Sequence, residues 1–186
     1  MIVAVIRHAK VDMKWKSRMT SAEYDNGCAD YDAATVLPVT VNLPPVKFQK
    51  IYVSNLPRTT ATARQVVGDR EFHATSLINE VPARSGFDTG MKLPGFVWSS
   101  ACRIQWLTNM RRQPETRTQT RRRAERFVRH LIRQNEDCAV FTHGFFMITL
   151  MQELKKQGFR PDHERLNYAN GEAVICRKLP LQREGI

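Results

Sequence analysis

The stretch IVAVIRHA, at residues 2–9, joins an unbroken apolar run to an arginine and a histidine. The run is short, continuous and mostly β-branched, which is typical of a strand buried on both faces of a sheet. Arg7 and His8 follow at the carboxyl end of that strand. Ligands of open α/β sheets bind at this end of the strands, so the stretch indicates both a fold class and an anion site.

The other periodic segments alternate between strand and helix patterns. Further strands are expected at residues 51–54, 71–75, 138–141 and 172–179, and helices at 57–67, 96–110, 115–135 and 145–157, with a short helix near 20–24. Residues 10–49 and 79–95 otherwise lack a clean period and are expected to be irregular. This alternation predicts one domain over residues 1–186, a three-layer α/β/α sandwich with a mostly parallel central sheet.

Two of the predicted helices have apolar faces that can be named. In the 96–110 helix the expected face contains Val97, Ala101, Ile104 and Leu107. In the 115–135 helix it contains Ala124, Phe127, Val128, Leu131 and Ile132. The second set follows the i, i+3, i+4, i+7 spacing of a helix that packs one side against a core.

The composition is that of a folded globular chain. Hydrophobic residues make up 42% of the 186 positions, which excludes a disordered chain and is enough for one full core. No apolar run reaches the length of a membrane span, and residues 2–6 are too few for a secretory signal, so a cytoplasmic location without membrane attachment is expected. The cysteines are not spaced as a metal site and are expected to be free thiols: Cys28, Cys102, Cys138 and Cys176.

Basic charge is concentrated in residues 111–133. This stretch holds nine arginines and two glutamates and so carries +7 of the net charge of +11. Most of these arginines fall opposite the apolar face, which predicts a solvated helix surface. An anionic substrate, an acidic membrane surface or a nucleic acid could also be attracted there. Nucleic acid is the less favoured partner, because no aromatic residues interleave with the arginines as a stacking surface would require.

Three segments place reactive side chains directly after predicted strands. These side chains are Arg7 and His8, then Arg58, and finally His143. The carboxyl ends of parallel strands share one edge of a sheet, so the two arginines and two histidines are expected on one rim. Arginine binds phosphate oxygens through paired hydrogen bonds, and the helices starting near Arg58 and after Gly144 would direct amide groups at the same anion. Because histidine can act as a nucleophile, the pattern predicts a phosphate pocket with a nucleophilic or acid–base histidine.

In order and spacing, these segments resemble the three motifs of the histidine phosphatase superfamily, also called the phosphoglycerate mutase-like family. Residues 7–9 (RHA) are similar to its Arg-His-Gly signature. Residues 54–63 (SNLPRTTATA) resemble its second motif, which has an Arg-x-x-x-Thr-Ala core, and residues 142–144 (THG) resemble its third. The resemblance spans residues 2–179 and implies a phosphoglycerate mutase-like fold.

The resemblance also implies a role for individual residues. His8 would be the nucleophile that becomes phosphorylated, while Arg7, Arg58 and His143 would bind the phosphoryl group and its developing charge. Glu80 resembles the family's general acid, which would protonate the leaving oxygen and then activate water. Three other carboxylates are alternatives for that acid: Asp12, Asp88 and Glu153. No metal ion or other cofactor is required.

Departures from the family pattern bear on the activity. Ala9 replaces the commoner glycine, and the family's Leu-Thr-x-x-Gly-x-x-Gln-Ala helix is not recognisable in residues 10–49. The tryptophan and asparagine that follow the first motif in the mutases have no clean match, since Trp15 is offset and precedes Lys16. The prediction is therefore a phosphatase acting on a phosphorylated small molecule or a phosphoprotein. A phosphoglycerate mutase-type enzyme and a catalytically idle basic binding protein are the alternatives.

Overall fold

The structure is a computed structural model that describes residues 1–178. Its main sheet contains β1 (Ile2–Arg7), β3 (Lys50–Val53), β4 (His73–Ala74), β6 (Cys138–Thr142), β7 (Phe159–Pro161) and β8 (Ala173–Lys178). A small second sheet pairs β2 (Arg18–Met19) with β5 (Leu93–Pro94). The helices are α1 (Ser21–Ala33), α2 (Pro57–Val67), α3 (Gly95–Leu107), α4 (Arg117–Gln134) and α5 (Gly144–Lys156), with a 3-10 helix, η1, at Ser76–Ile78.

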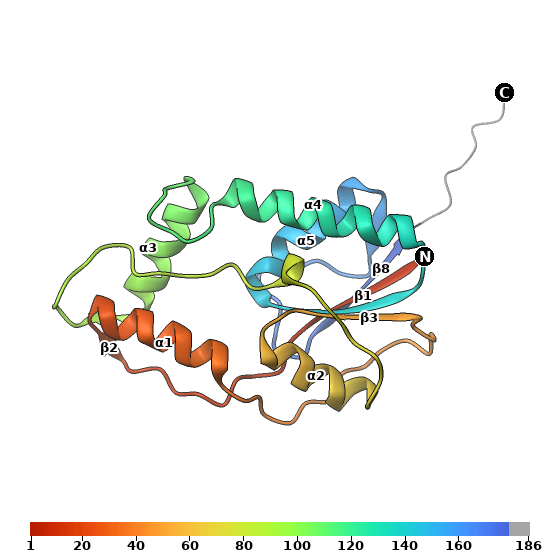
Figure 1. The fold of residues 1–186 in the computed structure, drawn as a ribbon, viewed down its shortest axis with the longest axis horizontal. Helices are drawn as coiled ribbons and strands as arrows, with labels where there is room; N and C mark the ends of the chain where they lie inside the picture. The colour runs from red at the N-terminus through yellow and green to blue at the C-terminus, as the bar shows by residue number, and fades with distance from the viewer. Residues whose placement is uncertain (179–186) are drawn as a thin grey trace.

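The main sheet is mostly parallel. Its strand order is β4-β3-β6-β1-β8-β7. The first four strands in this order run parallel, whereas β8 is antiparallel to β1 and β7 is antiparallel to β8. One face is covered by α2 and the other by α4 and α5 (Figure 1). The predicted three-layer α/β/α sandwich is therefore confirmed.

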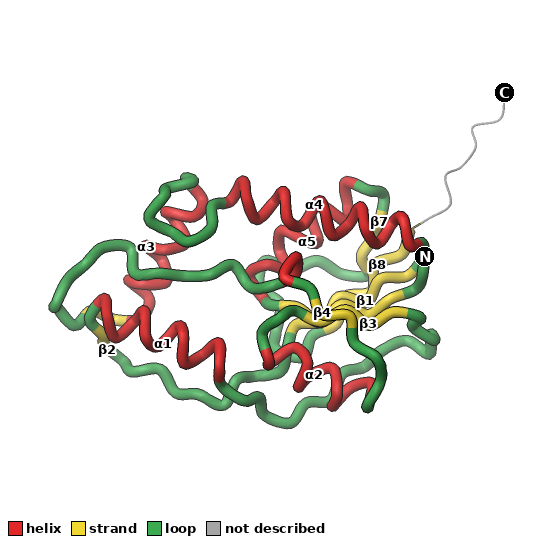
Figure 2. Tube along the Cα trace, in the orientation of Figure 1, coloured by secondary structure: helices red, strands yellow, loops and turns green. Residues whose placement is uncertain are grey.

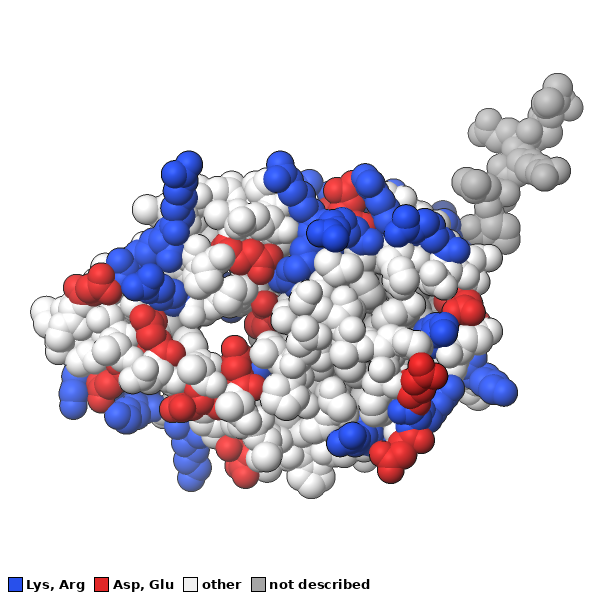
Figure 3. All heavy atoms as spheres, in the orientation of Figure 1, with Lys and Arg blue, Asp and Glu red and all other residues white. Residues whose placement is uncertain are grey.

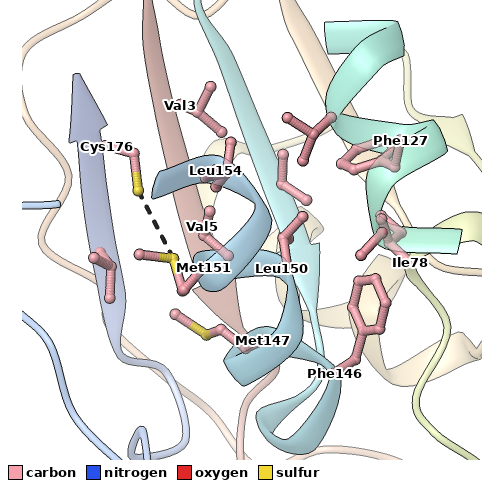
Figure 4. Packing of buried hydrophobic residues seen from close by; sticks show 14 of the residues in the cluster. Val3, Val5, Ile78, Phe127, Phe146, Met147, Leu150, Met151, Leu154 and Cys176 are labelled. Atoms are coloured by element: carbon pink, nitrogen blue, oxygen red, sulfur yellow. Dashed lines mark hydrogen bonds between the residues drawn. The ribbon is translucent and has the colours of Figure 1, made fainter. Parts of the chain in front are cut away.

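Successive residues of a strand point to opposite faces of the sheet, and so the strands divide the interior into two cores. Val3 and Val5 of β1 belong to the larger core, beside α4 and α5, whereas Ala4 and Ile6 belong to the core beside α2. Figure 4 shows the larger core, where Leu154 of α5 lies over β1. Burial on both faces explains why residues 2–6 are apolar without interruption.

A smaller unit, which we call the cap, lies at the carboxyl ends of the parallel strands. It comprises residues 10–34 and 82–110 and contains β2, α1, β5 and α3 (Figure 2). Its buried core is small and consists of Met19, Tyr24 and Trp98. The Trp98 indole N–H donates to the Met19 carbonyl, which ties α3 to β2.

The cap contains the main differences from the sequence predictions. The helix predicted near residues 20–24 is much longer, since α1 runs from Ser21 to Ala33 behind a reciprocal Thr20–Glu23 cap. The predicted apolar face of α3 is wrong, because Ile104 and Leu107 are 60% and 49% exposed. Its buried residues are instead Trp98, Cys102 and Trp106. The indole N–H groups of both tryptophans find acceptors, so these large rings can be buried in place of the aliphatic residues.

Outside the cap, the predicted elements agree closely with the structure. The apolar face of α4 is buried as predicted, with Ile132 at its edge. The predicted strand at 172–179 corresponds to β8, and residue 179 lies outside the described residues. The short strands β2, β5 and β7 are not predicted.

All four cysteines are free thiols. Within residues 1–178, no helix is both long and apolar enough to cross a membrane.

Candidate active site

Three parallel strands bring the predicted site residues to one edge of the sheet. Arg7, at the end of β1, is in register with Thr142 of β6, and β6 lies between β1 and β3. His8, Arg58 and His143 follow these strand ends and are 1%, 1% and 0% exposed. The His8 and His143 rings lie 5.1 Å apart between centroids. The structure thus places the two histidines together, as expected for a shared ligand.

His8 is held in the protonation state that a nucleophile needs. Its Nδ1 lies 2.7 Å from the Ala9 carbonyl oxygen, which can only accept, so Nδ1 carries the proton and Nε2 keeps its lone pair. Burial lowers the pKa of His8 to about 3; the hydrogen bond to Ala9 opposes this shift, and the charges of Arg58 and Arg7 add to it. The imidazole is therefore neutral at physiological pH.

His143 is linked through its two ring nitrogens to Arg58 and Ser54. The Arg58 Nε–H donates to His143 Nδ1 at 3.1 Å, so the proton lies on Nε2, which is 2.8 Å from Ser54 Oγ. Burial, and after it the charge of Arg58, lowers the pKa of His143 well below its ordinary value. In this arrangement the ring orients the Arg58 guanidinium. Direct contact between His143 and a phosphoryl group stays a prediction.

Arg58 has a partner that the sequence does not indicate. Its Nη1 lies 2.8 Å from Oδ1 of Asp32, near the end of α1, and its Cζ lies 5.2 Å from the Tyr31 ring centroid. In this ion pair, the negative charge of Asp32 compensates the positive charge of the buried Arg58 guanidinium. The Asp32 side chain is 48% exposed, so this carboxylate remains in contact with water while it pairs with the buried guanidinium.

Arg7 lies directly against the glycine of the third motif. A Cβ at Gly144 would come within 2.7 Å of Arg7 Cζ, so a larger residue there would displace the guanidinium. Arg7 Nη1 donates to the Tyr168 carbonyl, while the buried Nε has no hydrogen-bond partner. Since Arg7 also borders the cavity described below, it retains a donor for an anion.

The second motif fixes the backbone around His8. Thr62, the threonine of the Arg-x-x-x-Thr-Ala core, accepts from the Ala9 N–H at 2.9 Å and donates to the Arg58 carbonyl at 2.7 Å. Asn170 adds a second connection, since its Nδ2 donates to the His8 carbonyl at 3.0 Å. The backbone of His8 and Ala9 is therefore held from both α2 and the loop before β8.

Glu80, the predicted general acid, is held against the start of α5. Its carboxylate accepts from the N–H of Phe146 at 2.9 Å and from that of Phe145 at 3.3 Å. The sequence predicts that the helix after Gly144 directs its amide groups at a bound anion. These bonds contradict that prediction, because the two amide groups face Glu80 and are not available to an anion. Glu80 itself borders the cavity described below.

The three alternative carboxylates lie away from the cavity. Asp88 forms an ion pair with an arginine at the surface. Glu153 is buried further along α5, where it pairs with Lys156. Asp12 is exposed, and its side chain does not border the cavity. The geometry therefore favours Glu80 over all three.

A cavity of about 1110 Å³ lies beside these residues, between the rim of the sheet and the cap. Figure 3 shows a hollow between the cap and the sandwich, with acidic and basic side chains around it. One wall comes from α1 together with Trp15, and another from residues 79–83 and the start of α5. Arg7, Arg58 and Glu80 border the cavity, so anion-binding groups adjoin a space large enough for an organic molecule.

The arginine-rich stretch contributes mainly to the surface. Arg123 is an exception, because it pairs with Glu115 at 3.0 Å and donates to the Asn79 carbonyl at 2.7 Å, next to Glu80. The exposed arginines form a basic surface along α4 (Figure 3): Arg117, Arg121, Arg122, Arg126, Arg129 and Arg133. Binding of a nucleic acid or another anion to this surface stays a prediction.

The comparison with protein families tests the resemblance stated above. The model of the histidine phosphatase superfamily (branch 1) matches residues 3–177. The chain belongs to the histidine phosphatase superfamily. No match to it was found among curated proteins.

Solved structures show the same fold at low sequence identity. The alpha-ribazole phosphatase from Shigella flexneri is 18% identical, with a TM-score of 0.58 and coverage of 94% of this chain and 89% of that chain. The phosphoserine phosphatase from Entamoeba histolytica is 14% identical, with a TM-score of 0.52 and coverage of 94% and 89%. The mycobacterial glucosyl-3-phosphoglycerate phosphatase is 16% identical, with a TM-score of 0.50 and coverage of 83% and 79%. Similarity at this level supports the superfamily fold and does not identify a substrate.

The superfamily motifs locate the rim but not the wall of the cavity formed by the cap. Tyr31 and Asp32 contact Arg58, yet they lie in a segment without periodicity or a recognisable motif. In the sequence, Trp15 stands out only as a tryptophan that does not match the position of the one that follows the first motif in the mutases. Within residues 1–178, no group of three or more His, Cys, Asp or Glu side chains is arranged to hold a metal ion.

Proposed function

We propose that this chain is a phosphatase that hydrolyses a phosphomonoester through a phosphohistidine on His8. The observation that carries the proposal is the buried, neutral imidazole of His8, whose Nε2 is unprotonated and which lies near the charges of Arg7 and Arg58. Membership of the superfamily supports it. The three solved structures described above are named as phosphatases of different compounds, so they support the reaction class without indicating which compound this chain uses.

In the first step, His8 Nε2 attacks phosphorus, a P–N bond forms and the P–O bond of the ester breaks. The leaving oxygen takes a proton from the Glu80 carboxyl group. Arg7 and Arg58 bind the non-bridging oxygens and stabilise the developing charge. The Ala9 carbonyl accepts the Nδ1–H bond and so stabilises the positive charge that the ring gains.

In the second step, water attacks phosphorus and gives a proton to the Glu80 carboxylate. The P–N bond breaks, which releases inorganic phosphate and returns His8 to its neutral form. A small substrate is favoured over a phosphoprotein, because α1 of the cap forms one wall of the cavity beside Arg58.

The test is formation of the phosphoenzyme. Brief incubation with radiolabelled acetyl phosphate should label the wild-type protein through a bond that is stable in alkali and labile in acid. His8→Ala should carry no label. His73→Ala provides a control, since His73 lies on β4 and does not border the active-site cavity. An unlabelled wild-type protein, or a labelled His8→Ala variant, would contradict the proposal.

Product analysis then separates hydrolysis from transfer. Release of inorganic phosphate from the labelled protein supports a phosphatase. Isomerisation of a phosphoglycerate without phosphate release would support the mutase alternative. A protein that forms no phosphoenzyme but binds polyanions in a salt-sensitive manner would support the basic binding protein.

A further inference from the structure

A row of aromatic side chains leads from the nucleophile into the cavity. The Tyr31 ring centroid lies 6.5 Å from that of His8, and the Trp15 centroid lies 6.0 Å from that of Tyr31. Tyr24 continues the row, 5.8 Å from Trp15. All three of these aromatic residues border the cavity. The phosphoryl group needs only the rim of the sheet, so this row is placed to contact the group that the phosphate esterifies.

Trp15 is held in position by a glycine of α1. A Cβ at Gly27 would lie 2.8 Å from Trp15 Cζ3, so only glycine allows the indole to lie this close to the helix backbone. Glycine is unfavourable inside a helix, because it loses more conformational freedom on folding than other residues. The contact between Trp15 and α1 is therefore a specific feature of this cap.

Trp15 also differs from the other tryptophans of the chain. Trp98 and Trp106 are 0% and 9% exposed, and the indole N–H of each donates a hydrogen bond. Trp15 is 41% exposed and borders the cavity, so it does not fill a core. An exposed indole on a cavity wall provides a surface on which a planar ring can stack.

We infer that Trp15 is the stacking site for a planar aromatic ring in the leaving group of the substrate. The position of Tyr31 between His8 and Trp15 sets a further requirement. The ring must be separated from the phosphate by a spacer about as long as a sugar, which would lie against Tyr31. The substrate is thus a phosphomonoester of the nucleoside type. This inference rests on the proposed function, because it names the substrate class of the same site.

The test compares two phosphomonoesters that differ only by the ring. Adenosine 5′-monophosphate and ribose 5-phosphate share the phosphate and the sugar, and only the first has an aromatic base. The wild-type protein should hydrolyse the nucleotide with a kcat/KM about tenfold higher, the size of effect that one stacked base produces. Trp15→Leu should reduce kcat/KM for the nucleotide to that for ribose 5-phosphate and leave the latter unchanged.

Two further variants show whether the ring itself is responsible. Trp15→Phe keeps an aromatic ring and should retain most of the preference. Phe96→Leu is the matched control, because Phe96 is 71% exposed on α3 and does not border the cavity. Equal kcat/KM for the two substrates in the wild-type protein overturns the inference. So does an equal loss for both substrates in Trp15→Leu.

Tryptophan fluorescence separates failure of this inference from failure of the proposed function. Adenosine 5′-monophosphate should quench the emission of the wild-type protein, ribose 5-phosphate should not, and Trp15→Phe should abolish the quenching. Quenching without a phosphoenzyme on His8 would leave the stacking site in place and overturn the proposed function. A phosphoenzyme on His8 without quenching or substrate preference would support the proposed function and overturn the stacking site.

Discussion

The rim of the sheet and the cap face the same cavity but are built differently. On the rim, His8, Arg58 and His143 are almost completely buried, and hydrogen bonds from neighbouring elements hold each of them. The cap's own core cluster is small, built on Met19, Tyr24 and Trp98, and the cap leaves Phe96 and Ile104 71% and 60% exposed. Its contribution to the cavity is a wall of mixed aromatic and acidic side chains.

Because the rim is buried and hydrogen-bonded while the cap has only a small core of its own, we expect substitutions in the two regions to have different effects. A nucleophile and its charged partners must keep a fixed geometry, and the strand ends of a sheet buried on both faces supply it. A wall that selects the leaving group needs shape and ring surfaces but no comparable precision. We therefore expect rim substitutions to remove activity toward every substrate, and cap substitutions to change substrate preference or local stability.

The largest effect is expected from Arg58→Ala on the rim. This change removes a buried guanidinium that binds His143 and borders the cavity, so kcat/KM for any phosphomonoester substrate should fall about 10³-fold. Steady-state kinetics measure the loss. Arg64→Ala, on the same helix but with a side chain that is 64% exposed, should be unaffected. Near-normal activity of Arg58→Ala would show that the rim does not bind the phosphoryl group.

The rim is the region that could be predicted from the sequence. Continuous apolar runs predict strands buried on both faces, and parallel strands must end at a shared edge, so Arg7, His8 and His143 could be placed together before the structure. The proline-initiated helix α2 likewise places Arg58 at its first turn. Local patterns suffice there because the sheet fixes the position of each strand end.

The cap could not be predicted in the same way, because its positions depend on long-range contacts. The Tyr24 ring packs on Trp98, which is 74 residues away in sequence and lies in a different helix. One side of α1 lines a cavity and not a core, so it lacks the apolar period that marks α4. Nothing local indicates that Asp32 pairs with Arg58, since each is on a separate segment.

Trp98→Ala tests whether the cap is the less stable region. It removes the largest side chain of the cap core and the bond to the Met19 carbonyl, so the cap should lose about 3 kcal/mol of stability. Hydrogen exchange should accelerate at the amides of α1 and α3, while those of β1 and β6 keep their protection. Phe96→Ala, an exposed position on the same helix, should change neither. Equal acceleration in the sheet would mean that cap and sandwich unfold together.

Glu80→Gln tests the residue that links the two regions. If Glu80 protonates the leaving oxygen, the rate of phosphoenzyme formation from an alkyl phosphomonoester should fall about 10²-fold. Phosphoenzyme formation from p-nitrophenyl phosphate, measured as the initial burst of p-nitrophenolate, should change little, because its leaving oxygen needs no proton. Hydrolysis of the phosphoenzyme should slow after either substrate, because water loses its proton acceptor. Glu153→Gln is the control, since Glu153 is a buried carboxylate that pairs with Lys156 away from the cavity. A similar loss in the rate of phosphoenzyme formation from both substrates in Glu80→Gln would assign Glu80 to holding the start of α5 instead.

The last effect concerns the pH dependence of stability, which reports on the neutral histidines of the rim. Burial lowers the pKa of His8 to about 3 and that of His143 well below its ordinary value, whereas an unfolded chain keeps histidine near pKa 6.5. Below pH 6.5 the unfolded state therefore binds protons that the native state does not. The stabilisation is complete above pH 6.5 and is lost progressively as the pH falls toward 3, by roughly 1 kcal/mol per pH unit for each histidine.

Urea unfolding between pH 6.5 and 5 measures this slope. The range lies above that in which carboxylates such as Glu172, whose pKa is lowered, change charge. His143→Asn should reduce the slope to about half, because one of the two buried histidines is then absent. A free energy of unfolding that stays constant over this range would mean that the buried histidines take up protons in the native protein as they do in the unfolded chain. The imidazole of His8 would then lose the Nε2 lone pair that attack on phosphorus requires as soon as the pH falls below 6.5, whereas a native pKa of about 3 keeps that lone pair down to much lower pH.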